Sequence, residues 1–535
     1  MSTILNTIPG KIPEVLRVGQ HGLKRGGKIV AHRHVMPVSS YSNTHYMLQD
    51  ERITPETNAP VTAFRENNNV GFLISSKIQQ VKEMDFAATI TNINSTAATA
   101  QVLAWQPETA VPADVDLNGG YMYFYFPGYG STSILPYNTS IADWQTAIDK
   151  VDGDLAGLTV GGQPFSSGSA GPLTITVPVK YGALPIQLIA IDPTHAGGRA
   201  TILAETQTAY AAGGSCILGP GPVIFERSTL EFNDSEKESL RGTHWFYMLM
   251  LMTHEERLYD LGKLIGYDFV RDKSRNFIDG NGGQLTIYVP LINMLTLQEK
   301  YLPAFHARTK LMVKVYFRGN NSIFESGSGT TSVSDLELSA SYLYIRHKEY
   351  SPDMLTALVK VRGLNPITYR YHDHITSVLE TGTYIAGQQY QPKINKTGDL
   401  VEALFVLRSS AKSVASDYYK GFKLTDIEVR DENNTSLLGY DKITDEYMRN
   451  AIIPRTYPDI GEEIIKNFNL YVWPIGAAIN YSKETGALDG AYKLRQTDEV
   501  RIRPATTPSS TAQVVMFYTL IRAIKVFPNG TVVDT

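Results

Sequence analysis

One pattern of apolar and polar residues occurs twice in this chain, once near the middle and once at the C-terminal end. In each copy, alternating apolar strands follow a corner that is marked by Pro and Gly. The first copy spans residues 285–317 and the second spans residues 470–530. Alternation with a period of two residues is typical of half-buried β-strands. The repetition therefore predicts two β-sandwiches in tandem.

The alternation also predicts individual strands of the first sandwich. Residues 64–105 contain two strand-like stretches, with which this sandwich begins. In residues 310–317, Lys310 and Lys314 lie on the opposite face from the apolar side chains of Leu311, Val313, Val315 and Phe317. Residues 335–347 close the sandwich, and their alternating positions are Leu336, Leu338, Ala340, Tyr342 and Tyr344.

Residues 119–221 combine Tyr-rich text of strand character with segments rich in Gly and Ser. Such composition predicts long loop insertions in the first sandwich, and long ordered loops often carry function. The aromatic stretch at residues 119–130 has two interpretations. It is either an exposed interface or loop-tip element, or a buried strand.

Two helices are expected. The first begins at Asp234 or Ser235, either of which can cap an acidic first turn, and its apolar residues continue to Leu264. The second has Ser351 as its capping residue and a proline at its first helical position. This second helix, at residues 348–361, is predicted to link the two sandwiches.

These elements divide the chain of 535 residues into two large domains and two smaller segments. Residues 1–50 form a basic extended arm, and residues 51–347 form the first sandwich with its insertions. Residues 348–361 form the linker helix. Residues 362–535 contain about eight short strand candidates and form the second sandwich.

Composition narrows the range of functions. The net charge of −4 gives the whole chain no strong field for nucleic acid or an anionic membrane. The single cysteine, Cys216, excludes an intrachain disulfide framework and a cysteine zinc site. The longest compact apolar run, residues 245–252, is too short to cross a bilayer. Because the N-terminus lacks the apolar core of a signal peptide, no secretion is predicted.

Positive charge is concentrated in residues 1–49, where Glu14 is the only acidic residue. The basic residues of this arm are Lys11, Arg17, Lys24, Arg25, Lys28 and Arg33. Six cations against one anion give a formal charge of +5. The arm either contacts something outside its own domain or is a tail that wraps over that domain.

From about Pro220 to the C-terminus, the order and spacing of several motifs resemble a known family. It is the double jelly-roll major capsid proteins of icosahedral double-stranded DNA viruses, in the lineage of nucleocytoplasmic large DNA viruses and virophages. In its first roll, an apolar stretch with a proline, here Pro303, separates two strands. A later strand with a tyrosine, here Tyr344, precedes a charged turn and a helix. The matching positions of the second roll are Pro474, Gly476, Asn480, Ser482, Tyr518 and Gly530.

The resemblance implies an all-β fold of two tandem eight-stranded antiparallel jelly rolls joined by a short helix. It implies a structural protein and not an enzyme. Three copies would form a six-sided, pseudo-hexameric capsomer of the virion's capsid shell, assembled inside the host cell. The implied partners are neighbouring capsomers, minor capsid and penton proteins, and an internal membrane or packaged DNA at the basic arm. No cofactor and no small-molecule substrate are implied.

Motifs for catalysis and metal binding are incomplete. The pair His254 and Glu255 lacks the second histidine of a zinc protease helix, because Leu258 occupies that position. His372 and His374 share one strand face without an identifiable third metal ligand. The sequence contains no P-loop, dinucleotide-binding or serine hydrolase motif.

Two alternatives stay open. The chain could be a minor capsid or scaffolding protein of the same fold, which copy number in the particle would distinguish. It could also be a two-domain β-sandwich enzyme or lectin that acts on polysaccharide. That alternative predicts a monomer and, for an enzyme, two carboxylates about 5–10 Å apart in a cleft.

Overall fold

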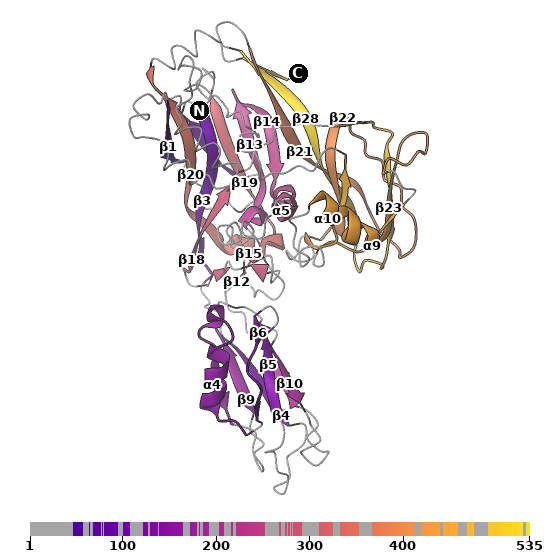
Figure 1. Cartoon of the computed structure of the whole chain (residues 1–535). Coiled ribbons are helices and arrows are strands. Elements are labelled where there is room, and N and C mark those ends of the chain that lie inside the picture. Colours follow the sequence, from indigo (N-terminus) through magenta and orange to yellow (C-terminus); the bar gives the residue numbers. More distant parts are fainter. Residues whose placement is uncertain are drawn as a thin grey trace, which may run out of the picture.

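The computed structural model describes the chain from β1 onward, with gaps. The described residues are 46–56, 64, 68–75, 78, 80–94, 100–107, 121–126, 129–136, 138–163, 172–178, 181, 184, 186–191, 203–207, 216–217, 221–251, 267–268, 273–274, 277–278, 280, 282–291, 310–324, 332–352, 366–411, 419–438, 442–457, 468–475, 491–527 and 531–534. Two β-sandwiches lie side by side, and a smaller unit extends from one end of the first (Figure 1).

The first sandwich consists of two four-stranded antiparallel sheets. One sheet has the order β1 (Tyr46–Ile53), β20 (Leu336–Tyr350), β3 (Gln80–Asn92) and β18 (Gln284–Pro290). The other has the order β14 (Ser235–Arg241), β13 (Phe225–Phe232), β19 (Leu311–Phe317) and β2 (Asn69–Ile74). Along the chain, the first of these eight strands pairs with the eighth, the second with the seventh, the third with the sixth and the fourth with the fifth. This rolled double ribbon is a jelly roll.

A second jelly roll follows with the same pairing scheme. Its larger sheet contains β21 (Ile367–Gly382), β28 (Ala512–Val526), β22 (Gly398–Ser409) and β25 (Tyr471–Pro474), with β26 (Tyr492–Leu494) and β29 (Val532–Asp534) alongside. The smaller sheet contains β24 (Ile443–Thr444), β23 (Leu424–Arg430) and β27 (Glu499–Pro504). The place of the second strand is taken by single bridges from Tyr390 and Lys393 to β27. The prediction of two tandem jelly rolls is confirmed.

Inward-facing aromatic residues join the two sheets of the first roll. Phe86 of β3 contacts Phe72, Phe225 and Phe317 of the facing sheet, with ring centroids 5.4–6.0 Å apart. The predicted strand at 310–317 is confirmed as β19, in which Leu311, Val313, Val315 and Phe317 are buried. Alternation therefore identified the inward face of this strand correctly.

In β20 the predicted alternation holds only at the start. Leu336 and Leu338 are buried, but the register shifts by one residue between Leu338 and Ala340, where β20 pairs with β3. A β-bulge of this kind moves all later side chains to the opposite face. The inward residues are then Ser341, Leu343, Ile345 and His347, so the expected inward placement of Tyr342 and Tyr344 is wrong.

The predicted start of the first helix is also wrong. Residues 235–241 form strand β14, which pairs with β13 across a two-residue turn. Asn233 and Asp234 have φ values of 49° and 61°. Two consecutive residues with positive φ match a type I′ hairpin turn, for which Asn and Asp are favoured. Local turn chemistry therefore continues the sheet where the acidic residues suggested a helix.

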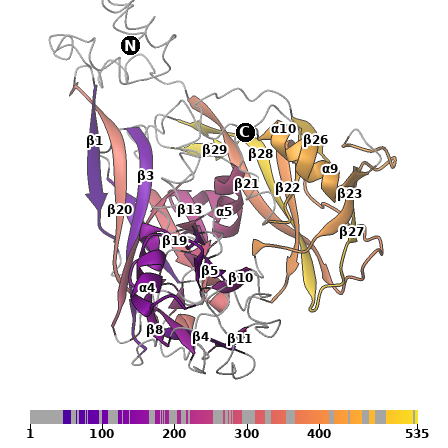
Figure 2. The ribbon, with the colours of Figure 1, turned by 60° about the horizontal axis from the view of Figure 1, so that its bottom comes forward.

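The helix itself is α5 (Gly242–Leu251), and it lies between the two rolls (Figures 1 and 2). A glycine is required at its first position, because a Cβ at Gly242 would lie 2.2 Å from the carbonyl oxygen of Pro222 and 2.4 Å from that of Phe225. The chain can therefore turn directly from β14 into the helix. The continuation to Leu264 lies outside the described residues.

Strands and a helix form much of the segment that was expected to be loops. One sheet contains β11 (Leu203–Gln207), β4 (Gln101–Pro107), β9 (Leu173–Val177) and β8 (Thr159–Gly162). The other contains β10 (Gln187–Ile191), β5 (Tyr121–Phe126), β6 (Gly130–Ser131) and β7 (Leu135–Pro136), and α4 (Ile141–Asp149) follows. We call this unit, residues 100–207, the insert. It connects to the rest of the first roll after β3 and before β13.

The insert has its own hydrophobic core, separate from that of the rolls. Phe124 of β5 is its centre, with ring centroids 5.0 Å from both Trp105 of β4 and Trp144 of α4. A single continuous core, in contrast, runs through both rolls. The insertion is therefore a folded unit where it is described, and not only a set of loops.

Short elements complete the structure. They are η3 (Gly153–Leu155), β12 (Cys216–Ile217), η6 (Gly221–Ile224), β15 (Tyr267–Asp268), β16 (Lys273–Ser274), β17 (Phe277–Ile278), η8 (Asn321–Ile323), η9 (Val333–Asp335), α9 (Asp445–Tyr447), η10 (Met448–Ile452) and α10 (Ile453–Thr456). At the predicted linker helix, β20 continues to Tyr350, and helical conformation begins at Pro352. Residues 353–361 lie outside the described residues, as does the basic arm up to residue 45.

Candidate interaction surfaces

The two rolls and α5 form a stack of layers. From one flank to the other, these are the β1-β20-β3-β18 sheet, the β14-β13-β19-β2 sheet, α5, the large sheet of the second roll and its small sheet (Figures 1 and 2). The two outermost sheets therefore face away from each other. Their outer faces are the broad sheet surfaces of the rolls that can meet another molecule.

The joint between the rolls is built on α5. Tyr247 donates a hydrogen bond to the carbonyl oxygen of Tyr419, 2.7 Å away, and its ring centroid lies 5.0 Å from that of Phe517. His244 contacts His374 of β21, with ring centroids 5.3 Å apart. All of these side chains are buried, so the joint is an apolar and aromatic interface that holds the rolls as one body.

Burial governs the ionisation of the two histidines in this joint. It lowers the pKa of His244 from 6.5 to about 3. Burial also lowers the pKa of His374 well below its usual value, and the neighbouring His244 and His372 lower it further. Both side chains are therefore neutral at pH 7, and His374 shares a hydrogen bond of 3.1 Å between its Nδ1 and the hydroxyl of Thr519.

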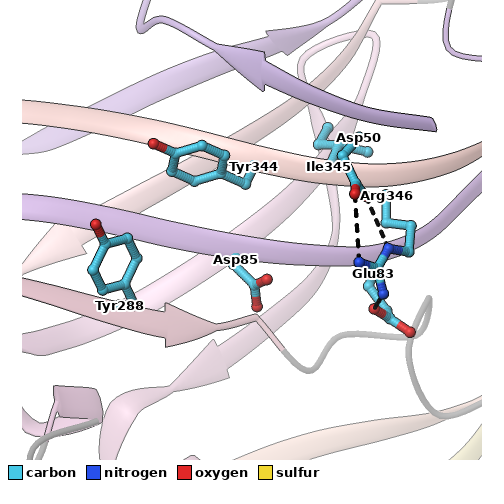
Figure 3. A pocket seen from close by; sticks show the side chains of 7 residues that line it. All are labelled: Asp50, Glu83, Asp85, Tyr288, Tyr344, Ile345 and Arg346. Carbon is cyan, nitrogen blue, oxygen red and sulfur yellow. Dashed lines mark hydrogen bonds and ion pairs between the residues drawn. The ribbon is translucent and has the colours of Figure 1, made fainter. Parts of the chain in front are cut away.

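The outer face of the first roll carries an open hollow of about 320 Å³ (Figure 3). Four strands line it. Asp50 of β1, Arg346 of β20 and Glu83 of β3 are neighbours in one row of the register, and Tyr344 of β20 and Asp85 of β3 are neighbours in the next. Tyr288 lies on the fourth strand, β18. The lining residues are Asp50, Glu83, Asp85, Tyr288, Tyr344, Ile345 and Arg346. We call this site the Asp85 hollow.

One arginine neutralises two of the three carboxylates in the Asp85 hollow. The Nε of Arg346 donates to Asp50 at 2.8 Å, and its Nη1 donates to Glu83 at 3.2 Å (Figure 3). The hydrogen bond from Arg346 lowers the pKa of Asp50. For Asp85, burial and then the nearby Glu83 raise the pKa. Within the described part of the chain, Asp85 makes no hydrogen bond or ion pair.

The outer face of the second roll is a ladder of ion pairs. On β23 and β27, Arg503 contacts Asp426 at 3.3 Å, and Arg430 contacts Glu428 at 2.9 Å. Arg501 donates to Glu499 at 2.7 Å. Asp426 is only 4% exposed. Each acid on these two strands therefore has a cationic partner.

The insert presents a stripe of tyrosines. In β5, Met122, Phe124 and Phe126 are buried, whereas Tyr121 and Tyr125 are exposed. The strand therefore has one face in the core of the insert and one face in solvent. The buried-strand interpretation is confirmed for the inward face, whereas an interface role of the exposed tyrosines stays a prediction.

The described residues that match the capsid motifs have structural positions. Tyr344 lines the Asp85 hollow on β20. Pro474 ends β25 opposite Glu402, and Tyr518 is fully buried in β28. The remaining matched residues, Pro303, Gly476, Asn480, Ser482 and Gly530, lie outside the described residues, as do the six basic residues of the arm.

Metal sites require clustered ligands, and membrane spans require long apolar helices. In that part of the chain, no group of three or more His, Cys, Asp or Glu side chains could hold a metal ion. His372 and His374 lie on β21, and His374 packs against His244. No helix among the residues described is long and apolar enough to span a membrane.

Sequence reasoning did not find the Asp85 hollow or the joint histidine on α5. Arg346 lies 263 residues from Glu83 and 296 from Asp50 along the chain. Only the strand register brings these residues together, and a β-bulge in β20 sets that register. No local motif in the sequence signals such a site.

Solved structures provide the comparison with known proteins. Neither protein-family profiles nor curated protein sequences match this chain. The structure of PBCV-1 VP54, fitted into a reconstruction of the virophage Sputnik, is similar with a TM-score of 0.53 and 9% identity. The match covers 92% of this chain and 98% of that one. A chain of the PBCV-1 virus capsid is similar with a TM-score of 0.52 and 8% identity, over 92% and 97% of the two chains.

These matches extend over nearly the full length of both partners, so they include the two rolls together and not one sandwich alone. At such low identity, the likeness establishes the fold. The pairing scheme of the strands gives the same answer independently. This chain has the double jelly-roll fold that is found in the PBCV-1 capsid.

Proposed function

We propose that this chain is a major capsid protein that assembles as a homotrimer into pseudo-hexameric capsomers of an icosahedral virus shell. The observation that carries the proposal is the duplication of one jelly roll within a rigid body. Both rolls have the same pairing scheme, and one continuous core joins them. Three such chains supply six similar blocks, which is what a six-sided capsomer requires.

The surfaces support a structural role. The outermost sheets of the two rolls face opposite directions, so each copy can meet two neighbours in a closed ring (Figure 2). The insert extends from one end of the rolls, whereas β29 and the start of β1 lie at the other end (Figure 1). A molecule with two lateral faces and two different ends suits a shell with an outside and an inside.

The specific assembly partners of this chain are part of the same proposal. The lateral faces would contact copies in the trimer and neighbouring capsomers. The end at β1, from which the basic arm emerges, would face minor capsid and penton proteins, an internal membrane or packaged DNA. The chain would reside in the capsid shell of the virion, after assembly inside the host cell.

Light scattering of the purified full-length chain, together with negative-stain images, tests the proposal. A capsomer predicts a mass of about three times 59.2 kDa and a six-sided outline. A clean monomer at high concentration would contradict it and favour the sandwich enzyme or lectin. Copy number in a purified particle then separates a major capsid protein from a minor or scaffolding one.

A further inference from the structure

We propose that the basic N-terminal arm of this chain docks on the outer face of its own first roll, where a lysine or arginine of the arm enters the Asp85 hollow. The occupant is residues 1–45, which precede β1 directly. This inference concerns the free protein and does not depend on the proposed capsid role.

The charge of the hollow favours a cation. Three carboxylates, those of Asp50, Glu83 and Asp85, face one guanidinium, that of Arg346, which leaves a formal charge of −2. The guanidinium is already engaged by Asp50 and Glu83. Asp85 is therefore the carboxylate that a further cation would neutralise.

The surroundings of Asp85 have the composition of a site for a cationic side chain. Burial and then Glu83 raise the pKa of Asp85, and the positive charge of Arg346 offsets only part of this rise. A second positive charge beside Asp85 would therefore stabilise its ionised form. The rings of Tyr344 and Tyr288 stand on the strands at either side of Asp85, and Tyr288 is 43% exposed (Figure 3). Aromatic rings beside a carboxylate add cation–π attraction for lysine or arginine.

A second arginine, Arg52, lies in the same row of the register as Asp85 but does not pair with it. Arg52 lies opposite Tyr344 in the pairing of β1 and β20, in the same row as Asp85. Its guanidinium instead stacks on the ring of Tyr342, 4.7 Å from the ring centroid. The cation that completes the hollow therefore has to come from elsewhere.

The arm has the charge and the reach. Its six cations against one acid give it the opposite sign from the hollow. The described chain begins at Tyr46, four residues before Asp50, which is about 13 Å of extended strand. Arg33 is thirteen residues before Tyr46, enough for about 43 Å. Because the arm is tethered beside its target, its effective concentration there is high.

The other flank of the molecule is a poor competitor for the arm. The carboxylates of the ladder on β23 and β27 already pair with Arg430, Arg501 and Arg503. An arm that approached this surface would have to displace an existing cation. Charge complementarity therefore directs the arm to the Asp85 hollow and not to acidic residues in general.

Limited proteolysis of the full-length chain with thermolysin tests the proposal, since its apolar cleavage sites within the arm survive charge substitutions. Asp85→Lys should speed cleavage within the arm by about fivefold to tenfold, as expected for the loss of a partly desolvated cation contact. The matched control is Glu337→Lys, which makes the same charge change on the same sheet outside the hollow. It should leave the cleavage rate within about twofold of the original.

A charge swap identifies the occupant. In the Asp85→Lys background, Lys24→Glu, Arg25→Glu and Lys28→Glu together should restore protection, although either set alone should reduce it. Asp85→Asn, which nearly preserves the side-chain shape, serves as a second variant if the lysine variant fails to fold. Its expected effect is about twofold to threefold. Circular dichroism and thermal melting report on the fold of every variant.

Three outcomes would overturn the proposal. Unchanged cleavage in both Asp85 variants would mean that the arm does not use the hollow. An equal effect of Glu337→Lys would reduce the observation to general electrostatics. Protection that disappears on hundredfold dilution would mean that the arm comes from another copy, because an intramolecular contact is independent of concentration.

Discussion

The two rolls have one strand-pairing scheme and two different outer faces. The first roll exposes tyrosines and the Asp85 hollow, in which one carboxylate has no ion partner among the described residues. The outer face of the second roll carries a ladder in which each acid on β23 and β27 has an arginine beside it. The fold depends on the inward residues of the strands, so the outward residues are free to differ.

This difference matters for the proposed assembly. In a ring of three copies, the outer face of one roll meets a neighbouring chain, and the two faces of a copy are distinct surfaces. Burying a complete ladder of ion pairs in an interface costs desolvation energy and forms no new ion pair. A face with tyrosines and an unpaired carboxylate offers apolar area and a hydrogen-bond acceptor to a partner. The two faces are therefore expected to have different roles.

The largest expected effect comes from breaking the joint that makes the two rolls one body. Tyr247→Ala removes a fully buried ring that packs on Phe517 and a hydrogen bond to Tyr419. We expect a loss of about 3–5 kcal/mol in the free energy of unfolding. Chemical denaturation should still show both rolls unfolding in one transition, because their core is continuous.

Tyr247→Phe is the matched control for the joint. It keeps the ring and removes only the hydroxyl, so we expect a loss of about 1 kcal/mol. If Tyr247→Ala instead separates the denaturation curve into two transitions, the rolls are independent bodies and the single-core description fails.

The second effect distinguishes the insert from the rolls. Phe124→Ala removes the ring at the centre of the insert core, which should cost the insert about 3–5 kcal/mol. Because that core is separate from the core of the rolls, the unfolding transition of the rolls should stay in place. Hydrogen exchange resolved by segment measures both parts, and a parallel loss of protection in the rolls would contradict the separation.

Sequence reasoning succeeded where the pattern was local. Alternation alone identified β19 and its inward face, because its four alternating apolar residues are all buried. It misplaced the helix start, since Asp234, a good helix cap, instead forms the hairpin turn together with Asn233, and the acidic residues that follow lie in strand β14. It lost the phase of β20 at a bulge, because no residue near Leu338 signals an extra position.

The joint at α5 and the Asp85 hollow could not be predicted from the sequence, for a different reason. The helix α5 is apolar on most sides because it is buried between two rolls, so its pattern does not indicate which face meets which neighbour. The resemblance to capsid proteins supplied the double jelly roll, but not the contacts of His244 or Arg346. Those contacts depend on three-dimensional register.

A third effect concerns pH and tests whether the joint is weaker in acid. His244 is neutral in the folded chain, since its pKa is lowered to about 3, and His374 shifts in the same direction. The unfolded chain takes up protons as pH falls through 6.5, whereas the folded chain does not. The contribution of His244 to the free energy of unfolding is therefore fully present above pH 6.5 and is lost progressively below it, by about 2 kcal/mol at pH 5.

Denaturation curves at pH 7 and pH 5 measure this loss. His244→Phe keeps an aromatic ring between His374 and Phe517 and removes the titrating group. The variant should lose about 2 kcal/mol less between the two pH values than the original chain. The same slope in both proteins would assign the acid sensitivity to carboxylates elsewhere.

The smallest effect compares the two outer faces directly by removing one arginine from each. Arg503→Ala leaves Asp426, which is 4% exposed, without its partner, so we expect a loss of about 1–2 kcal/mol. Arg346→Ala leaves Asp50 and Glu83, whose side chains are 66% and 44% exposed and can be solvated, so we expect less than about 0.5 kcal/mol. Thermal melting at low ionic strength measures both. Equal losses would mean that the ladder and the hollow are ion-pair surfaces of one kind, and the contrast between the rolls would then rest on the tyrosines alone.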